Sequence, residues 1–332
     1  MTAPLLQISH LSVTLPTRCG RFTALDDVSF EISAGEVLGV VGESGAGKSL
    51  TAAAVIGLLE PPLVQTGGEI RLEGERIDNL PQDALRRIRG KRIGAIFQDP
   101  LTSLNPLYTI GRQLTETIRT HLPLSAKAAE ARALELLQEV GIPAARERLG
   151  AYPHQFSGGM RQRVVIALAL AANPRLVIAD EPTTALDVST QAQIIALLKR
   201  LCRDHGTAIM LVTHDMGVIA ETADRVAVMY AGRVVEIGPV RDIVLAPQHP
   251  YTIGLMGAIP AIGHRLERLK QIDGAMPRLG AVPPGCAFNP RCPQVFDRCR
   301  AERPALTPAG STSAACWLAA ALPEMPEARR HG

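Results

Sequence analysis

Long apolar runs are absent from this sequence of 332 residues. The longest, Val164 to Ala172, is less than half of the roughly 20 residues that a helix needs to cross a bilayer. The first residues, "MTAPLLQISHLSVTL", lack the basic start and the apolar stretch of a secretion signal. We therefore expect a cytoplasmic chain that crosses no membrane by itself.

The sequence has no large excess of either basic or acidic residues, and aromatic side chains are also scarce. The 35 basic and 32 acidic residues are interspersed and leave a formal net charge of +3, so composition gives no indication of a nucleic-acid binder. Aromatic residues make up 3% of the chain and hydrophobic residues 46%. A sizeable core must therefore be built mainly from aliphatic side chains and alanine.

Strand and helix patterns alternate along most of the chain. Between residues 5 and 41, "LLQISHLSVTL", "DDVSFEI" and "EVLGVV" predict strands. Later, "RLVIAD", "AIMLVTH" and "RVAVMY" are continuous apolar runs, typical of strands buried in a parallel sheet. A helix is expected from about Lys48 to Leu59, ended by Pro61 and Pro62. This alternation predicts an α/β fold.

The middle of the chain has a helical pattern, whereas the end of the chain is rich in proline. In "SAKAAEARALELLQEVG", Ser125 is a helix N-cap and Gly141 a stop signal, so we expect an inserted helical subdomain over about residues 100–160. From Pro250 onward lie 11 of the 25 prolines, which predicts short, irregular elements. The simplest division is a nucleotide domain over 1–250 and an extension over 251–332.

One segment predicts a phosphate-binding loop. "GESGAGKS" fits the pattern G-x-x-x-x-G-K-S/T and lies between a predicted buried strand and a helix, the context that this motif requires. Its glycines allow backbone N–H groups to converge on phosphate oxygens at a helix N-terminus. Lys48 can reach the β and γ phosphates, and Ser49 can bind Mg²⁺. The predicted nucleotide contacts are Gly42, Glu43, Ser44, Gly45, Ala46, Gly47, Lys48, Ser49 and Leu50.

A pair of carboxylates completes the predicted chemistry. "RLVIADE" is an apolar strand that ends in Asp180, an expected Mg²⁺ ligand, and Glu181, which can orient or deprotonate the attacking water. On its own, such a pair usually marks a strand that meets solvent. The phosphate loop upstream favours the catalytic interpretation.

The segment "FSGGMRQR" predicts a second anion site. Ser157, Gly158 and Gly159 stand at the start of a helix expected to run through Ala172, so the serine hydroxyl and free N–H groups can bind an anion. The phosphate loop, its helix and Asp180 already enclose one face of a triphosphate. This second site should therefore hold a nucleotide that is bound elsewhere.

These motifs, in this order, resemble the ABC-transporter ATPases over nearly the whole chain. The resemblance implies two nucleotide domains arranged head to tail, with each ATP held between one phosphate loop and the other domain's "FSGGM". It also implies that Gln98 and His214 contact the γ-phosphate region, with Gln98 a further Mg²⁺ ligand. Phe22 is a candidate for stacking on adenine, although an aromatic residue in a strand is as often part of the core. Met160 stands where the family usually has glutamine.

The extension narrows this resemblance. "QHPYTIGLMGAIP", "GCAFNPRCPQVFDRC" and "TSLNP" are similar to the ATPases of dipeptide, oligopeptide and nickel importers, in which this would be a D-type subunit. Four cysteines without a histidine among them suit zinc or an iron–sulfur cluster. Their gaps of five, six and sixteen residues match neither the usual cysteine spacing of a zinc ribbon nor that of a ferredoxin. Some members of the branch hold a 4Fe–4S cluster here, which favours the cluster over zinc or metal-free thiols. The cysteines are Cys286, Cys292, Cys299 and Cys316.

The resemblance implies an ATPase on the cytoplasmic face of a bacterial inner membrane. It would use ATP and Mg²⁺ to import dipeptides, oligopeptides or a related solute. The expected partners are a second, non-identical ATPase subunit, two membrane permeases and a periplasmic solute-binding protein, without nucleic acid. The alternatives are a soluble ABC ATPase that acts on nucleic acid or the ribosome, and a regulatory subunit with low turnover.

Overall fold

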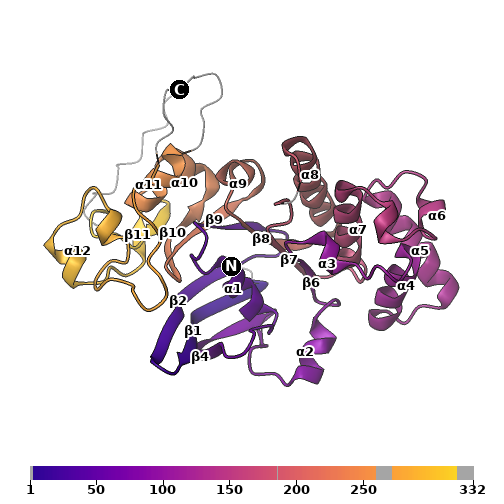
Figure 1. The fold of residues 1–332 in the computed structure, drawn as a ribbon, viewed down its shortest axis with the longest axis horizontal. Helices are drawn as coiled ribbons and strands as arrows, with labels where there is room; N and C mark the ends of the chain where they lie inside the picture. The colour runs from indigo at the N-terminus through magenta and orange to yellow at the C-terminus, as the bar shows by residue number, and fades with distance from the viewer. Residues whose placement is uncertain (1–2, 185, 259–270, 320–332) are drawn as a thin grey trace.

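Two β-sheets and the helices around them form the computed structural model, which describes residues 3–184, 186–258 and 271–319 (Figure 1). Arg265 to Lys270 and the end of the extension lie outside these ranges. No described helix is both long and apolar enough to cross a membrane.

The larger sheet carries the predicted site. Within the described residues it has the order β11-β12-β10-β9-β3-β8-β7-β6, parallel from β9 to β6 and antiparallel beyond β9. The apolar runs predicted as buried parallel strands form β7, β8 and β9, which confirms that prediction. The strands are β3 (Val37–Val41), β6 (Ile93–Ile96), β7 (Leu176–Asp180), β8 (Ala208–Thr213), β9 (Arg225–Tyr230), β10 (Arg233–Pro239), β11 (Thr307–Ala309) and β12 (Thr312–Ala314).

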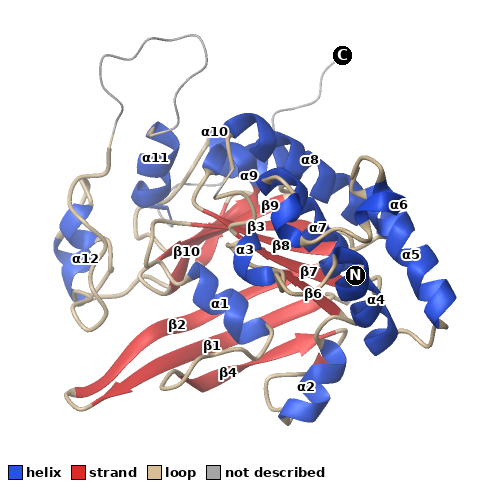
Figure 2. Cartoon of the chain, turned by 45° about the vertical axis from the view of Figure 1, so that its right-hand side comes forward, coloured by secondary structure: helices blue, strands red, loops and turns tan. Residues whose placement is uncertain are grey.

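The smaller sheet is antiparallel and has the order β2-β1-β4-β5. Its inner side chains share one hydrophobic cluster with helix α1 (Lys48–Val55) and with one face of the larger sheet. Figure 2 shows α1 above these strands. The strands are β1 (Leu6–Thr17), β2 (Gly20–Ile32), β4 (Val64–Leu72) and β5 (Glu75–Arg76).

Most of the remaining helices lie at the other face or at the two ends of the large sheet, whereas α2 lies near β4 of the smaller sheet (Figure 2). Helices α3 to α7 occupy the segment expected to be helical. The helices are α2 (Gln82–Ile88), α3 (Pro100–Ser103), α4 (Ile110–His121), α5 (Ala126–Glu139), α6 (Ala145–Arg148), η1 (Pro153–Gln155), α7 (Gly158–Leu170), α8 (Val188–His205), α9 (Met216–Thr222), α10 (Val240–Leu245), α11 (Pro250–Gly257), η2 (Asn289–Arg291) and α12 (Asp297–Ala301).

The helix ends follow local chemistry. Ser125 caps α5 by accepting a hydrogen bond from the Ala128 amide, and Gly141 follows the helix with φ 72°, as predicted. The expected end of α1 near Leu59 is wrong, because the helix ends at Val55. Gly57 adopts φ 66°, and the Arg89 guanidinium donates to the carbonyls of Ile56 and Gly57, which satisfies two of the free groups at this helix end.

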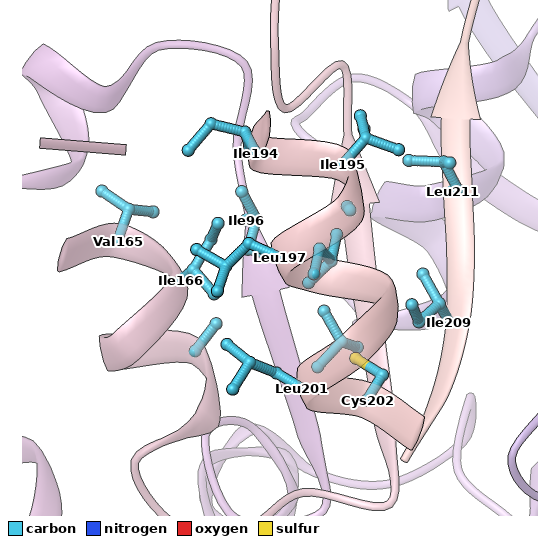
Figure 3. Packing of buried hydrophobic residues seen from close by; sticks show 14 of the residues in the cluster. Ile96, Val165, Ile166, Ile194, Ile195, Leu197, Leu201, Cys202, Ile209 and Leu211 are labelled. Atoms are coloured by element: carbon cyan, nitrogen blue, oxygen red, sulfur yellow. The ribbon is translucent and has the colours of Figure 1, made fainter. Parts of the chain in front are cut away.

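The second hydrophobic cluster lies between the large sheet and helices α7 and α8. Figure 3 shows Ile166 of α7, Leu201 of α8 and Ile209 of β8 in this cluster. Nearly all of its members are aliphatic, as the scarcity of aromatic residues requires. This core fixes the strand ends from which the site is built.

We predict that Leu201→Ala lowers the free energy of unfolding by about 3 kcal/mol, because Leu201 is 3% exposed and its removal leaves a cavity. Urea denaturation followed by circular dichroism measures the change. Leu245→Ala is the matched control, since Leu245 is 71% exposed, and it should shift stability by less than about 0.5 kcal/mol. Equal losses in the two variants would contradict the packing described here.

Candidate functional site

The phosphate loop connects β3 to α1 and has the predicted form. Gly45 and Gly47 adopt φ 85° and 103°, conformations that disfavour any residue with a side chain. A Cβ at Gly47 would also lie 2.7 Å from Leu25 Cδ2, so β2 packs directly under the loop. The loop ends where the free N–H groups of α1 begin, which makes it suited to an anion.

Lys48 is held inside the loop. Its side chain is 5% exposed, and Nζ donates to the carbonyl oxygens of Gly42 at 2.9 Å and Glu43 at 3.1 Å. Burial lowers the pKa of Lys48, although the nearby carboxylates Glu181 and Asp180 oppose this shift. A bound phosphate group would offer this ammonium group stronger, charged acceptors than two carbonyls.

Ser49 and Asp180 meet directly. Ser49 Oγ donates to Asp180 Oδ1 at 3.0 Å, although β8 lies between β3 and β7 in the sheet. Burial raises the pKa of the Asp180 carboxyl, and the hydrogen bond from Ser49 opposes that shift. A hydroxyl and a carboxylate are oxygen donors of the kind that Mg²⁺ binds, so this pair fits that ion.

Glu181 is the centre of the predicted catalytic group. Its carboxylate accepts hydrogen bonds from Gln98 Nε2 at 3.2 Å and Thr184 Oγ1 at 2.8 Å, and His214 Nδ1 lies 3.2 Å from its other oxygen. Burial opposes ionisation, but the hydrogen bonds from Thr184 and His214 prevail and lower the pKa of Glu181. The structure therefore brings together three residues that the sequence places far apart, with Glu181 ionised.

These groups line one cavity of about 1080 Å³, roughly the upper size of a small-ligand pocket. Lys48, Ser49, Gln98, Glu181 and His214 all face it. Among the other predicted contacts, the cavity is lined by Ser44, Gly45, Gly47 and Leu50, whereas Gly42, Glu43, Ala46 and Asp180 complete the loop and the strand end behind it.

The second predicted anion site lies apart from this cavity. Ser157 caps α7, with its hydroxyl accepting from the Met160 amide at 3.4 Å, and Ser157, Gly158 and Gly159 are not among the described residues that line the cavity. All three are at least partly exposed. Arg161 and Arg163 donate to backbone carbonyls of their own chain. The exposed part of the site is therefore the serine and the glycines.

Phe22 does not line the phosphate-loop cavity. It lies in a neighbouring cavity of about 480 Å³ between β2 and the extension. A Cβ at Gly280 would overlap its ring, so the extension packs against it. The phosphate-loop cavity is also lined by Leu15 and by the extension residues Met276, Leu279 and Val282, none of which was predicted from the sequence. No local motif marks them.

The extension's four cysteines surround one small cavity together with His249. Their thiols are free, and burial raises the pKa of Cys286 to about 11. Within the described part of the chain, no three cysteine, histidine or carboxylate side chains are placed to hold a metal ion. As placed here, the thiols do not form a ligand set for the predicted 4Fe–4S cluster or for zinc.

Comparisons with known proteins agree with this geometry. Residues 25–184 match the ABC transporter family, and residues 235–299 match the C-terminal region of oligopeptide/dipeptide transporters. The oligopeptide transport ATP-binding protein OppD of Haemophilus influenzae is 48% identical over 317 residues, which cover 96% of this chain and 98% of that protein. The oligopeptide transport ATP-binding protein AppD of Bacillus subtilis is 46% identical over 316 residues, which cover 95% and 96%.

Solved structures show the same fold. A dimeric ATP-binding cassette bound to ADP and phosphate superimposes with a TM-score of 0.64 at 31% identity, and the match covers 71% of this chain and 99% of that one. A second dimeric structure, of a bacterial ABC transporter cassette, gives a TM-score of 0.63 at 32% identity over the same shares. The chain therefore belongs to the ATP-binding proteins of the ABC transporter family, in the branch that carries the oligopeptide/dipeptide transporter C-terminal region.

Proposed function

We propose that this chain is the ATP-hydrolysing subunit of an ABC importer that drives the uptake of dipeptides or oligopeptides. The observation that carries the proposal is the carboxylate of Glu181, which is hydrogen-bonded to Gln98 and close to His214 beside a phosphate loop. The names of the relatives, oligopeptide transport ATP-binding proteins, support the substrate class.

Each group of the site has a proposed part in hydrolysis. Lys48 exchanges its two carbonyl acceptors for the β and γ phosphates of ATP. Ser49, Asp180 and Gln98 offer oxygen ligands to Mg²⁺, which neutralises charge on the phosphates when bound. Glu181 orients the attacking water and accepts its proton, and His214 contacts the γ-phosphate.

The exposed site at the start of α7 supports a composite arrangement. We propose that Ser157, Gly158 and Gly159 bind the ATP that a second ATPase subunit holds on its own phosphate loop. The dimeric cassettes that share this fold support such pairing. In the branch that the sequence resembles, the second subunit is non-identical, and we extend that arrangement to this chain.

An apolar groove beside Gln98 supports contact with a permease. The groove has a volume of about 400 Å³ and is lined by side chains of α1 and β6 and by Phe97, which is 46% exposed. We propose that a helix of one of the two permeases docks in this groove next to Gln98, which would place this chain on the cytoplasmic face of the inner membrane. A periplasmic binding protein would deliver the solute.

We keep the proposed division into a nucleotide domain over residues 1–250, with its helical subdomain at about 100–160, and an extension over 251–332. The family match at 25–184 lies within the proposed nucleotide domain, whereas the match at 235–299 begins in β10, includes α10 and crosses the proposed boundary.

We predict that Glu181→Gln lowers ATP hydrolysis by about 100-fold or more, because the amide cannot accept the proton of the attacking water. ATP binding should persist, since Lys48 and the loop are unchanged. The measurement is phosphate release and peptide uptake by the transporter reconstituted with its permeases in liposomes. Glu135→Gln, an exposed change on α5, is the matched control.

A Glu181→Gln variant with near-normal turnover would reject the catalytic role and favour a regulatory subunit. Hydrolysis that is lost together with peptide uptake supports the importer. Hydrolysis that responds to nucleic acid and not to peptide would instead support a soluble ABC ATPase.

We predict that Ser157→Ala lowers turnover of the assembled transporter by about tenfold, the value of one charge-assisted hydrogen bond, without changing the ATP affinity of the isolated chain. The control is Ser125→Ala, because Ser125 also caps a helix through its side chain and its loss costs about the same 1 kcal/mol of helix stability. Equal losses of turnover in the two variants would show that only capping matters.

The 4Fe–4S cluster, with zinc as its alternative, stays a prediction for the cysteines Cys286, Cys292, Cys299 and Cys316. Their grouping around one cavity supports it, whereas their present placement does not form a ligand set. Iron, sulfide and zinc analysis of anaerobically purified protein should find about four iron atoms per chain. Protein without iron or zinc that hydrolyses ATP at full rate would leave the thiols metal-free.

A further inference from the structure

The extension folds back onto the phosphate loop of its own chain. Arg291 donates through Nη1 to Glu43 Oε2 at 3.0 Å and through Nη2 to Glu43 Oε1 at 3.1 Å, so the guanidinium and the carboxylate form a bidentate pair. The Arg291 side chain is 7% exposed. Its Nε also donates to the carbonyl of Asp273 at 2.8 Å, which ties the start of the described extension to the same arginine.

A buried aromatic group supports this attachment. The Tyr251 hydroxyl accepts a hydrogen bond from the Glu43 amide at 2.8 Å, and the Tyr230 and Tyr251 ring centroids lie 4.7 Å apart. Phe288, three residues before Arg291, packs edge-on against Tyr230 at 5.2 Å. All three rings are at most 2% exposed. Both the backbone and the side chain of Glu43 are thus held by residues outside the loop.

The tethered segment reaches the nucleotide cavity. Met276, Leu279 and Val282 line it together with the phosphate loop, and a Cβ at Gly45 would lie 3.9 Å from Met276 Cγ. Leu279 is 43% exposed and Val282 38% exposed. A ligand that covers apolar side chains in a water-filled cavity removes their surface from water, and this burial favours binding. The phosphate groups of a nucleotide belong at Lys48 and the loop, whereas its base is the part that suits an apolar wall.

We propose that residues 276–282 of the extension form the base-side wall of the nucleotide pocket, held in place by the Arg291–Glu43 pair. Phe22 lies against Gly280 in the neighbouring cavity, so its ring does not form this wall. This inference rests on the proposed ATP-binding function and adds a part of the binding site contributed by the extension.

The test uses the full-length chain and compares ATP with inorganic tripolyphosphate, which has no base. Leu279→Ala should weaken ATP binding by about five- to tenfold, because apolar contact with the base is lost, and should leave tripolyphosphate binding unchanged. Leu306→Ala is the matched control, since Leu306 lies in the extension with a similar exposure of 37% and does not line the cavity. Isothermal titration calorimetry measures both affinities.

The second variant tests the anchor. Arg291→Ala should weaken ATP binding at least as much as Leu279→Ala, and Arg291→Lys should restore only part of it, because lysine cannot form the bidentate pair. Arg298→Ala is the control, since Arg298 pairs with Glu302 inside the extension. Circular dichroism melting checks that each variant is folded.

The outcomes separate this inference from the function on which it rests. Wild-type protein that binds ATP and loses it on Lys48→Ala, while Leu279→Ala and Arg291→Ala bind ATP normally, would overturn the wall and leave the ATPase standing. Equal weakening of ATP and tripolyphosphate by Leu279→Ala would also overturn it. Wild-type protein that binds neither compound would reject the proposed function itself.

Discussion

The alignment of four parallel strands is the constraint on which the site depends. The register pairs Val41 with Thr213, Val212 with Asp180 and Ala179 with Ile96, so β3, β8, β7 and β6 end nearly level at one edge of the sheet. The phosphate loop, His214, Glu181 and Gln98 follow these four ends. Ligands of open α/β sheets bind outside such carboxyl ends, and a slip in any register would separate the groups that now share hydrogen bonds.

Several residues at this edge of the sheet have a backbone conformation or a buried charge that is unfavourable by itself. Glu181 adopts φ 47°, a conformation uncommon for a residue with a side chain, and its amide donates to Val212 at 2.8 Å on the neighbouring strand. Lys48 is buried with only carbonyl acceptors, and the partly buried Asp180 has a raised pKa. Strain and desolvation gathered at one place are typical of functional sites. A triphosphate would supply the charge that these groups lack.

Sequence patterns predicted those parts of the molecule whose structure depends on interactions between residues that are close in the sequence. The loop from Gly42 to Ser49, the buried strands and the Ser125 cap each depend on residues within a few positions of one another. The end of α1 was missed because Gly57 is stabilised by Arg89, about thirty residues later. Arg291 contacts Glu43 across 248 positions, and no periodicity or spacing within one segment records such a pair. Phe22 fits an adenine contact by its position in the sequence, whereas packing by the extension places its ring elsewhere.

The Arg291–Glu43 pair also bears on how the extension relates to catalysis. An ion pair with one partner 7% exposed and the other 29% exposed is partly desolvated, so removal of either partner leaves an uncompensated charge beside the phosphate loop. The loop conformation that presents N–H groups to phosphate is therefore stabilised by a residue that lies 248 positions later in the chain. Because Glu43 also shares its backbone carbonyl with Lys48, a shift of the extension acts on the lysine through one residue. The C-terminal segment around Arg291 is therefore a structural support of the phosphate loop.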